Sequence, residues 1–318
     1  MKIRFAYALA AALVAGSVPA QGYPARPVRV VVPFPPGGAV DLIARSIQPK
    51  MSEALGQPVL IENRGGAAGN LGTELVAKGP HDGYTLVINT NGQAISLAMH
   101  DKLGWSAADF IPLTQLVSAH LILIASPAFP GRSVAEFVAL AKSKPGVLNY
   151  GGTGIGNPLH LSMEWLKLTA GVNVVAVHYQ GDAPLYTAMM AGQVDVAVVP
   201  FSTALPFVKS GKLRALAVTS ANRVPMLPEV PALAETFPGL VSTGWQGLFL
   251  PSRSPPEAAD ALYRAAARAL AASDVRERLQ SLSYEIVGSS PEQFKPVFEA
   301  EVARYMRIVK EAHIPLQD

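Results

Sequence analysis

Short apolar strings alternate with segments of helical periodicity along most of the chain. The apolar strings predict strands at 28–34, 59–63, 85–89, 121–126, 148–152, 174–179, 194–200, 213–219 and 247–251. Apolar residues at steps of three and four predict helices between them, at 41–55, 70–79, 133–144, 158–171, 183–193 and 201–212. Strands that are apolar throughout are typical of parallel sheets covered on both faces, so this repeated winding predicts an α/β fold.

The last third of the chain has a different pattern. Residues 255–282 and 290–312 form two long helical patterns with little strand between them, and Ser254 and Ser290, each before proline, are start signals. The proline-rich segment 221–247 precedes them. Because proline is excluded from sheet interiors, this segment is expected to cross between lobes.

Two stretches share one plan of strand, glycine-rich turn and helix start. They are VVVPFPPGGAVDLIAR, at 30–45, and LNYGGTGIGNPLHLSMEWL, at 148–166, about 120 residues later. Such an internal echo is what two similar α/β lobes would produce.

The glycine-rich turns predict anion binding. Asn157 before Pro158 is a good helix start, and the glycines that precede it expose backbone N–H groups at the positive end of the helix dipole. The alternative is a turn that only lets the helix pack on the strand. Neither a G-x-G-x-x-G fingerprint nor a P-loop lysine is present, which disfavours a phosphate cofactor.

Three acidic residues stand at junctions between predicted elements. Asp41 and Asp182 fall in the first turn of a helix, where a carboxylate satisfies free N–H groups, so a structural role is favoured over catalysis. Asp195 stands at or just before a strand and is either a cleft residue or a turn residue. Phe34 and Trp245 border a glycine-rich loop or a lobe junction, with ordinary packing as the alternative.

The first twenty residues predict a secretory signal peptide. They combine Lys2 and Arg4, an apolar stretch and small residues up to Ala20, after which cleavage is expected. The apolar run from Phe5 to Ala15 is too short for a retained membrane anchor. The sequence therefore predicts an exported protein.

Composition excludes several classes of function. The chain has no cysteine, which removes disulfides and thiolate sites, and its net charge of +3 falls to +1 without Lys2 and Arg4. No Lys/Arg run interleaved with aromatics is present, so nucleic acid is not an expected partner. The six histidines are dispersed without metal-ligand spacing, and no G-x-S-x-G elbow occurs, so neither a metal site nor a catalytic residue is expected. An exported two-lobed protein without catalytic signature suggests a solute-binding protein.

Several long blocks carry a family resemblance over the whole mature chain. These blocks are YPARPVRVVVPFPPGGAVDLIAR, VLIENRGGAAGNLGTELVAK, PHDGYTLVINTNGQ, LNYGGTGIGNPLHL, VHYQGDAPLYTAMMAGQVDVAV, GKLRALAVTS and ANRVPMLPEVPALAE. They closely resemble the Bug-type (TctC) substrate-binding proteins of tripartite tricarboxylate transporters. The resemblance implies a periplasmic two-lobe binding fold of type II, the Venus flytrap. It further implies a small organic carboxylate as ligand (a dicarboxylate, aromatic acid or amino acid), membrane subunits of a carrier as partners, no cofactor, and a monomer.

The resemblance also implies where the ligand binds. The residues it assigns to ligand binding are Phe34, Gly37, Gly38, Ala39, Asp41, Thr90, Asn91, Gln93, Thr153, Gly154, Gly156, Asn157, Tyr179 and Asp195. Gln93 stands where the family often has histidine, and Gln180 where it often has lysine, so this cleft is expected to be less basic. Asn157 and Pro158 replace a loop end that is often serine.

We expect residues 21–120 and 246–318 to form the first lobe and 121–245 the second. Two alternatives to delivery stay open: a sensor that presents its closed form to a membrane kinase, and an exported enzyme on the same fold.

Overall fold

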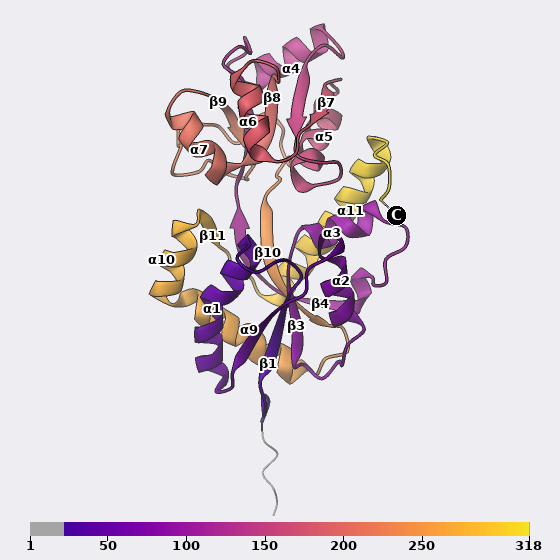
Figure 1. Cartoon of the computed structure of the whole chain (residues 1–318), viewed down its shortest axis with the longest axis vertical. Helices are drawn as coiled ribbons and strands as arrows, with labels where there is room; N and C mark the ends of the chain where they lie inside the picture. Colours follow the sequence, from indigo (N-terminus) through magenta and orange to yellow (C-terminus); the bar gives the residue numbers. More distant parts are fainter. Residues whose placement is uncertain (1–21, 318) are drawn as a thin grey trace, which may run out of the picture.

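The structure, a computed structural model, describes residues 22–317; the predicted signal peptide lies outside the described residues. Figure 1 shows two lobes, each built on one sheet and joined by extended segments. This arrangement confirms the predicted two-lobe α/β fold. No helix among residues 22–317 is long and apolar enough to cross a membrane.

The first lobe contains a six-stranded sheet in the order β11-β4-β10-β3-β1-β2. Its strands are β1 (Val28–Val32), β2 (Val59–Asn63), β3 (Thr85–Thr90), β4 (Phe110–Ala119), β10 (Gly244–Pro251) and β11 (Tyr284–Ile286). β1 pairs in parallel with both β2 and β3, whereas β10 runs antiparallel to β3 and β4.

Helices cover both faces of this sheet. They are α1 (Ala39–Leu55), α2 (Asn70–Ala77), α3 (Gly92–Met99), α9 (Pro256–Ala271), α10 (Ser273–Ser281) and α11 (Pro291–Glu311), with short 3-10 turns at Ala67–Gly69 and Ala107–Asp109. Ile43, Leu262 and Leu279 bring α1, α9 and α10 into one core. On the other face, α2, α3 and α11 share a core that continues into the second lobe.

The second lobe contains a five-stranded sheet in the order β7-β6-β8-β5-β9. Its elements are β5 (Leu121–Ala125), α4 (Val134–Ser143), β6 (Asn149–Gly152), α5 (Pro158–Ala170), β7 (Val175–His178), α6 (Asp182–Met190), β8 (Val196–Pro200), α7 (Phe201–Lys209), β9 (Arg214–Val218) and α8 (Leu233–Thr236). β6 is parallel to β7 and β8, and β5 is antiparallel to β8 and β9.

The chain crosses between the lobes twice, at adjacent places. His120 alone separates β4 from β5, and the second crossing runs from β9 to β10. Thr219 N–H donates to Leu121 O (3.0 Å), and Ser242 N–H donates to Thr219 O (2.8 Å), which ties the two crossings together.

Four elements were not predicted from the pattern: α3, β4, the short helix α8 and β11. In β4 the apolar run is interrupted by Pro112 and by the buried polar residues Thr114 and Gln115, so its periodicity is weak although the strand is central. The register between β4 and β10 shifts beside Pro112, where a residue without an N–H is tolerated.

The predicted helix 255–282 is wrong in one respect, because it is broken at Ala272 into α9 and α10. The predicted start at Ser254 is displaced to Pro255, which caps α9 without a side-chain hydrogen bond. The start at Ser290 is confirmed: its side chain accepts from Gln293 N–H, and the Gln293 side chain accepts in return from Ser290 N–H.

Candidate functional site

Strand order places a switch point in each sheet. From β1 the chain moves to β2 on one side and then to β3 on the other, and from β6 it moves to β7 and then to β8. In open α/β sheets, ligands bind outside the carboxyl ends of strands at such points. The loops concerned are β1–α1 and β3–α3 in the first lobe, and β6–α5 and β8–α7 in the second. Because β4 leads directly into β5, the sheet edges that carry these loops in the two lobes face each other at the crossings.

The β1–α1 loop leaves a helix start open to solvent. Gly38 is the N-cap of α1 without any side-chain cap, and Gly37 adopts a left-handed φ of 79° that favours glycine. A Cβ on Gly37 would meet nothing within 4 Å. Ala39 is exposed and Phe34 half-buried. The first amides of α1 therefore have neither an intrahelical partner nor a side-chain cap.

Asp41 braces this loop from behind. Its side chain is buried, and its carboxylate accepts from Gly37 N–H (2.9 Å), Arg45 Nε (2.8 Å) and Asn63 Nδ2 (2.9 Å). Burial alone would raise the pKa of Asp41, but these hydrogen bonds and the Arg45 charge hold it below its usual range. Asp41 is thus a support for the loop, with its oxygens occupied by protein donors.

The β3–α3 loop presents mainly Thr90. The Thr90 Oγ1 accepts from Gly92 N–H (3.0 Å). Asn91 is buried and donates through Nδ2 to Tyr305 Oη on α11 (3.2 Å). Gln93 is only 1% exposed, and its amide has no hydrogen-bond partner among the described residues. Asn91 and Gln93 therefore lie beneath the loop surface.

The β6–α5 loop is held by its own side chains. Asn157 Oδ1 accepts from His160 N–H (2.9 Å), which confirms the predicted cap, and Asn157 Nδ2 donates to Thr153 Oγ1 (3.3 Å). Gly154 and Gly156 have φ of 133° and 75°. These contacts fix the loop through its own side chains.

His160 fixes Gly156 inside this loop. Gly156 N–H donates to His160 Nδ1 (3.2 Å), so the neutral ring carries its proton on Nε2. Burial lowers the pKa of His160 to about 4, with His178 and Lys167 adding to the effect and Glu164 opposing it. The imidazole is therefore neutral at pH 7 and can accept that hydrogen bond.

Tyr179 and Asp182 lie at the neighbouring β7–α6 junction. Tyr179 N–H donates to Gly152 O (2.8 Å), next to the glycine loop, and Gly181 has a φ of 102°. Burial raises the pKa of the Asp182 carboxyl. Both residues belong to the same edge of the sheet as Thr153.

Asp195 does not lie at this edge, and its prediction as a cleft residue is wrong. It precedes β8, so it sits at the amino end of the parallel strands. Its Oδ2 accepts from Asn149 N–H (2.8 Å), and its N–H donates to Asn149 Oδ1 (2.9 Å). Asp195 thus joins the starts of β6 and β8, which is the turn role left open by the sequence.

Two parts of the site were missed from the sequence. In the second lobe, Ser202 and Thr203 are exposed in the first turn of α7, at the switch point of the sheet. In the first lobe, Asn63 Nδ2 donates to Phe34 O (3.1 Å) and so supports the β1–α1 loop. No glycine marks the β8–α7 junction. Only the strand order identifies it.

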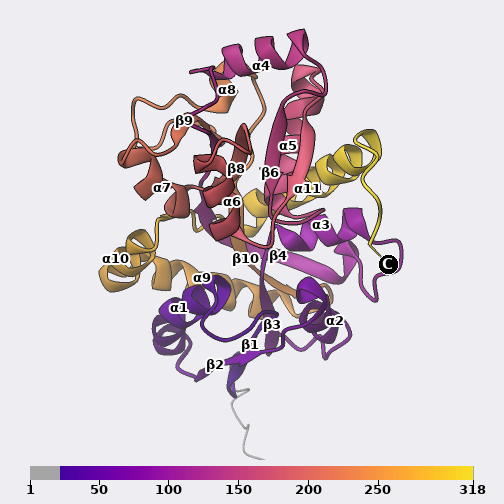
Figure 2. The same ribbon diagram turned by 45° about the horizontal axis from the view of Figure 1, so that its top comes forward.

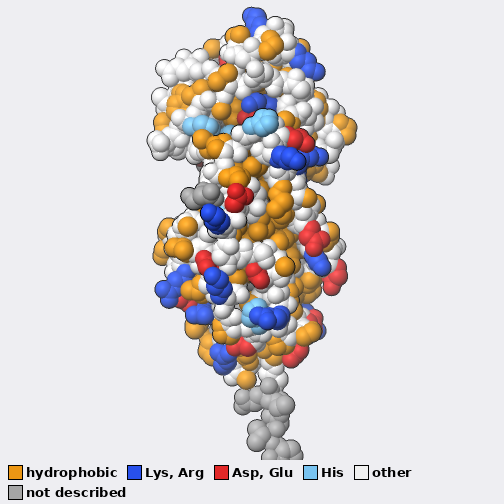
Figure 3. All heavy atoms as spheres, turned by 90° about the vertical axis from the view of Figure 1, so that its right-hand side faces the viewer, with side chains coloured by type: hydrophobic (Ala, Val, Ile, Leu, Met, Phe, Trp, Pro, Cys, Tyr) orange, Lys and Arg blue, Asp and Glu red, His pale blue; other side chains and the backbone are white. Residues whose placement is uncertain are grey.

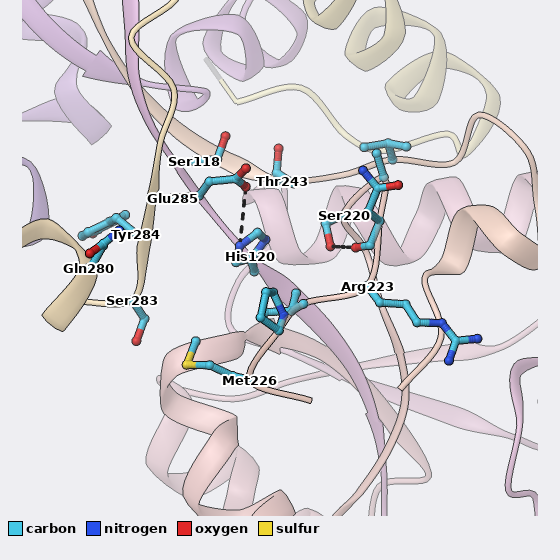
Figure 4. Close-up of a pocket in the computed structure, with 15 residues that line it drawn as sticks. Ser118, His120, Ser220, Arg223, Met226, Thr243, Gln280, Ser283, Tyr284 and Glu285 are labelled. Carbon is cyan, nitrogen blue, oxygen red and sulfur yellow. Dashed lines mark hydrogen bonds and ion pairs between the residues drawn. The ribbon is translucent and has the colours of Figure 1, made fainter. Parts of the chain in front are cut away.

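A cavity of about 710 Å³ lies beside the crossings (Figure 4). It is lined by His120 and Thr243 from the crossings, by Met226 from the second lobe, and by Ser283 and Glu285 from the first lobe. His120 Nε2 stands 3.6 Å from Glu285 Oε2. None of the residues predicted to bind ligand lines this cavity, and it lies at the β11 end of the first sheet, away from β1 and β3. We therefore place the candidate site at the switch points.

Among residues 22–317, no group of three His, Asp or Glu side chains is arranged to hold a metal ion.

The sequence matches known families over most of its length. The family described as "Tripartite tricarboxylate transporter family receptor" matches residues 43–314. The "UPF0065 protein in tcbD-tcbE intergenic region" of a Pseudomonas species is 35% identical, over 95% of this chain and 92% of that protein. "Protein BugT" of Bordetella pertussis is 31% identical, over 97% of this chain and 96% of its own.

Solved structures share the fold. A Rhodopseudomonas palustris protein with adipate is 34% identical (TM-score 0.72), covering 93% of this chain and 100% of its own. MatC of the same organism with bound malate is 33% identical (TM-score 0.70), covering 90% of this chain and 100% of its own. A TctC solute-binding protein from Polaromonas with no ligand is 25% identical (TM-score 0.83; 91% and 99%). The resemblance seen in the sequence is thereby confirmed, and the chain belongs to the TctC (Bug) family of solute-binding receptors.

Proposed function

We propose that this chain captures a small organic dicarboxylate between its two lobes and delivers it to the membrane subunits of a tripartite carrier. The observation that carries the proposal is the placement of both glycine loops at the switch points of facing sheet edges. Each loop offers helix-start amides, which favour negative charge. A ligand with two carboxylates suits two such anion-binding ends.

The proposed site includes the β1–α1 and β6–α5 loops with Thr90 and Tyr179, and adds the α7 start at Ser202 and Thr203. Asp41, Asn91 and Gln93 support it from below. Adipate and malate in the two related structures are both dicarboxylates, which supports this ligand class. The relatives are binding proteins, which supports delivery over turnover.

We also propose that the described arrangement is the open form. The unliganded relative has a TM-score of 0.83 at 25% identity, whereas the adipate and malate complexes reach only 0.72 and 0.70 at 34% and 33%. Sequence identity alone would favour the opposite order. This order supports a lobe arrangement like that of the unliganded relative, as expected if the ligand closes the lobes.

The remaining parts of the proposal concern export and assembly. We propose cleavage after Ala20, a periplasmic location and a monomeric binding protein. Mass spectrometry of the exported protein would give a mature chain that begins at Gln21, and a retained residue 1–20 segment would contradict export with cleavage.

A thermal-shift screen over dicarboxylates, monocarboxylates and neutral sugars tests the function. A ligand at a hundredfold excess over Kd adds about 2.7 kcal/mol of stability, so binding is readily detected. We expect adipate, malate or a related dicarboxylate to raise the melting temperature. A shift with sugars and none with carboxylates would contradict the proposal.

A substitution tests the loop itself. Gly38 has an ordinary φ of −74°, and its added Cβ would meet only Pro35 O at 3.3 Å, so Gly38→Val should fold. Its side chain would screen the α1 amides and abolish the shift. Gly22→Val, where nothing lies within 4 Å, is the control. Normal binding by Gly38→Val would make this loop a packing turn.

A further inference from the structure

One face of the molecule joins the two lobes through side chains. Figure 2 shows α3, α5 and α11 side by side there, and one hydrophobic core includes Trp165 of α5 together with Phe294 of α11. The Arg304 guanidinium of α11 lies 4.5 Å from the centre of the Trp165 ring. In Figure 3, which views this face, hydrophobic side chains gather at the waist between the lobes.

The segment after α11 continues this junction onto the second-lobe glycine loop. Gln317 N–H donates to Met99 O at the end of α3 (2.7 Å), and Gln317 Nε2 donates to Ile155 O (3.0 Å). Gln317 thereby hydrogen-bonds to both lobes at once.

Gly156 is enclosed by the same residues. A Cβ at this position would lie 2.6 Å from Met99 Cε and 3.1 Å from Gln317 Nε2. The Ile155–Gly156 peptide is thus fixed at both ends, because its carbonyl accepts from Gln317 and its N–H donates to His160. Fixing this peptide restricts the backbone of the residues on either side of it in the β6–α5 loop.

The first-lobe loop is connected to the same helix. Asn91, in the β3–α3 loop, donates to Tyr305 Oη, and Tyr305 adjoins Arg304 on α11. The β3–α3 and β6–α5 loops are therefore held by one support, formed by α11 and residues 314–317.

We propose that Gln317 is a positioning residue for the ligand site: it holds the β6–α5 loop in its binding conformation against the first lobe. This inference rests on the proposed function of that loop. Gln317 is exposed, so replacing it leaves the core intact. The sequence offered no signal for this role, since the residue lies about 160 positions from the loop it supports.

Calorimetric titration with adipate and with malate, on the wild type and on Gln317→Ala, tests the proposal. Loss of one net hydrogen bond predicts about a two- to tenfold increase in Kd. Gln317→Glu cannot donate to Ile155 O and brings negative charge to the loop, so its Kd should rise further. Leu316→Ala, at an exposed neighbour, is the control and should bind as the wild type.

Amide hydrogen exchange without ligand supplies a second readout. Residues 153–157 should exchange faster in Gln317→Ala, while α9 keeps its protection and the free energy of unfolding is unchanged. If the wild type binds neither acid nor any other carboxylate of the thermal-shift screen, the proposed function fails, and the exchange result alone then decides the loop support. If the wild type binds and Gln317→Ala shows the same Kd and the same exchange, the role of Gln317 is refuted.

Discussion

Acid should destabilise this protein through His160. The ordinary histidine pKa is 6.5, and burial lowers that of His160 to about 4. Between pH 4 and pH 6.5, His160 is therefore protonated in the unfolded chain and neutral in the folded chain. The stabilisation is complete above pH 6.5 and is lost as the pH falls toward 4.

The magnitude follows from the size of the shift. Each pKa unit corresponds to about 1.4 kcal/mol, so the full shift represents about 3 kcal/mol, most of which is lost between pH 7.5 and pH 4.5. The residue is 5% exposed, so solvent does little to screen this effect. Protonation also removes the acceptor of Gly156 N–H, which loosens the β6–α5 loop.

Urea denaturation at several pH values measures this contribution. The wild type should lose about 2–3 kcal/mol more than His160→Gln between pH 7.5 and 4.5, because glutamine can accept from Gly156 without titrating. Protection factors of residues 153–157, which correct the exchange rate for its intrinsic pH dependence, should fall as the pH is lowered over this range in the wild type only. Parallel pH profiles of the two proteins would refute the reasoning.

Two further substitutions address the loops. Asp41→Asn should lower the free energy of unfolding in urea by about 1.5–3 kcal/mol and weaken dicarboxylate binding, because hydrogen bonds to a charged acceptor are lost. The control Asp260→Asn, at an exposed ion pair, should lower it by less than about 1 kcal/mol. Equal losses for the two variants would contradict the supporting role of Asp41. Gly156→Ala should raise the Kd for dicarboxylates, because its Cβ would collide with Met99 at a φ of 75°. The control is Gly171→Ala, at a φ of 63° with open space around the added Cβ, which bears only the backbone strain of about 1–2 kcal/mol. An unchanged Kd for Gly156→Ala would show that the loop is not packed as described.

The glycine loops and the lobe pattern were predictable because they depend on local sequence. Asn157 before Pro158 specifies its cap, and the apolar strings specify buried strands. The position of Asp41 in the first turn indicated the structural role that its hydrogen bonds show, whereas the ligand-binding role that the resemblance implied for it stays a prediction.

The unpredicted parts depend on contacts distant in sequence. Asp195 pairs with Asn149, 46 residues away, and nothing in GQVDVAVV indicates this partner. Ser202 belongs to the candidate site only because β8 lies beside β6. The ligand roles assigned to Asn91 and Gln93 did not foresee that both side chains are covered, since burial depends on α11.

The most direct test of the central claim is a calorimetric titration with the dicarboxylate that gives the largest thermal shift, and with its uncharged diamide. Capture by helix-start amides predicts saturable one-to-one binding of the diacid and no detectable binding of the diamide, whose oxygens carry no negative charge. Equal affinity for both compounds, or binding of neither diacid nor any other carboxylate, would contradict it.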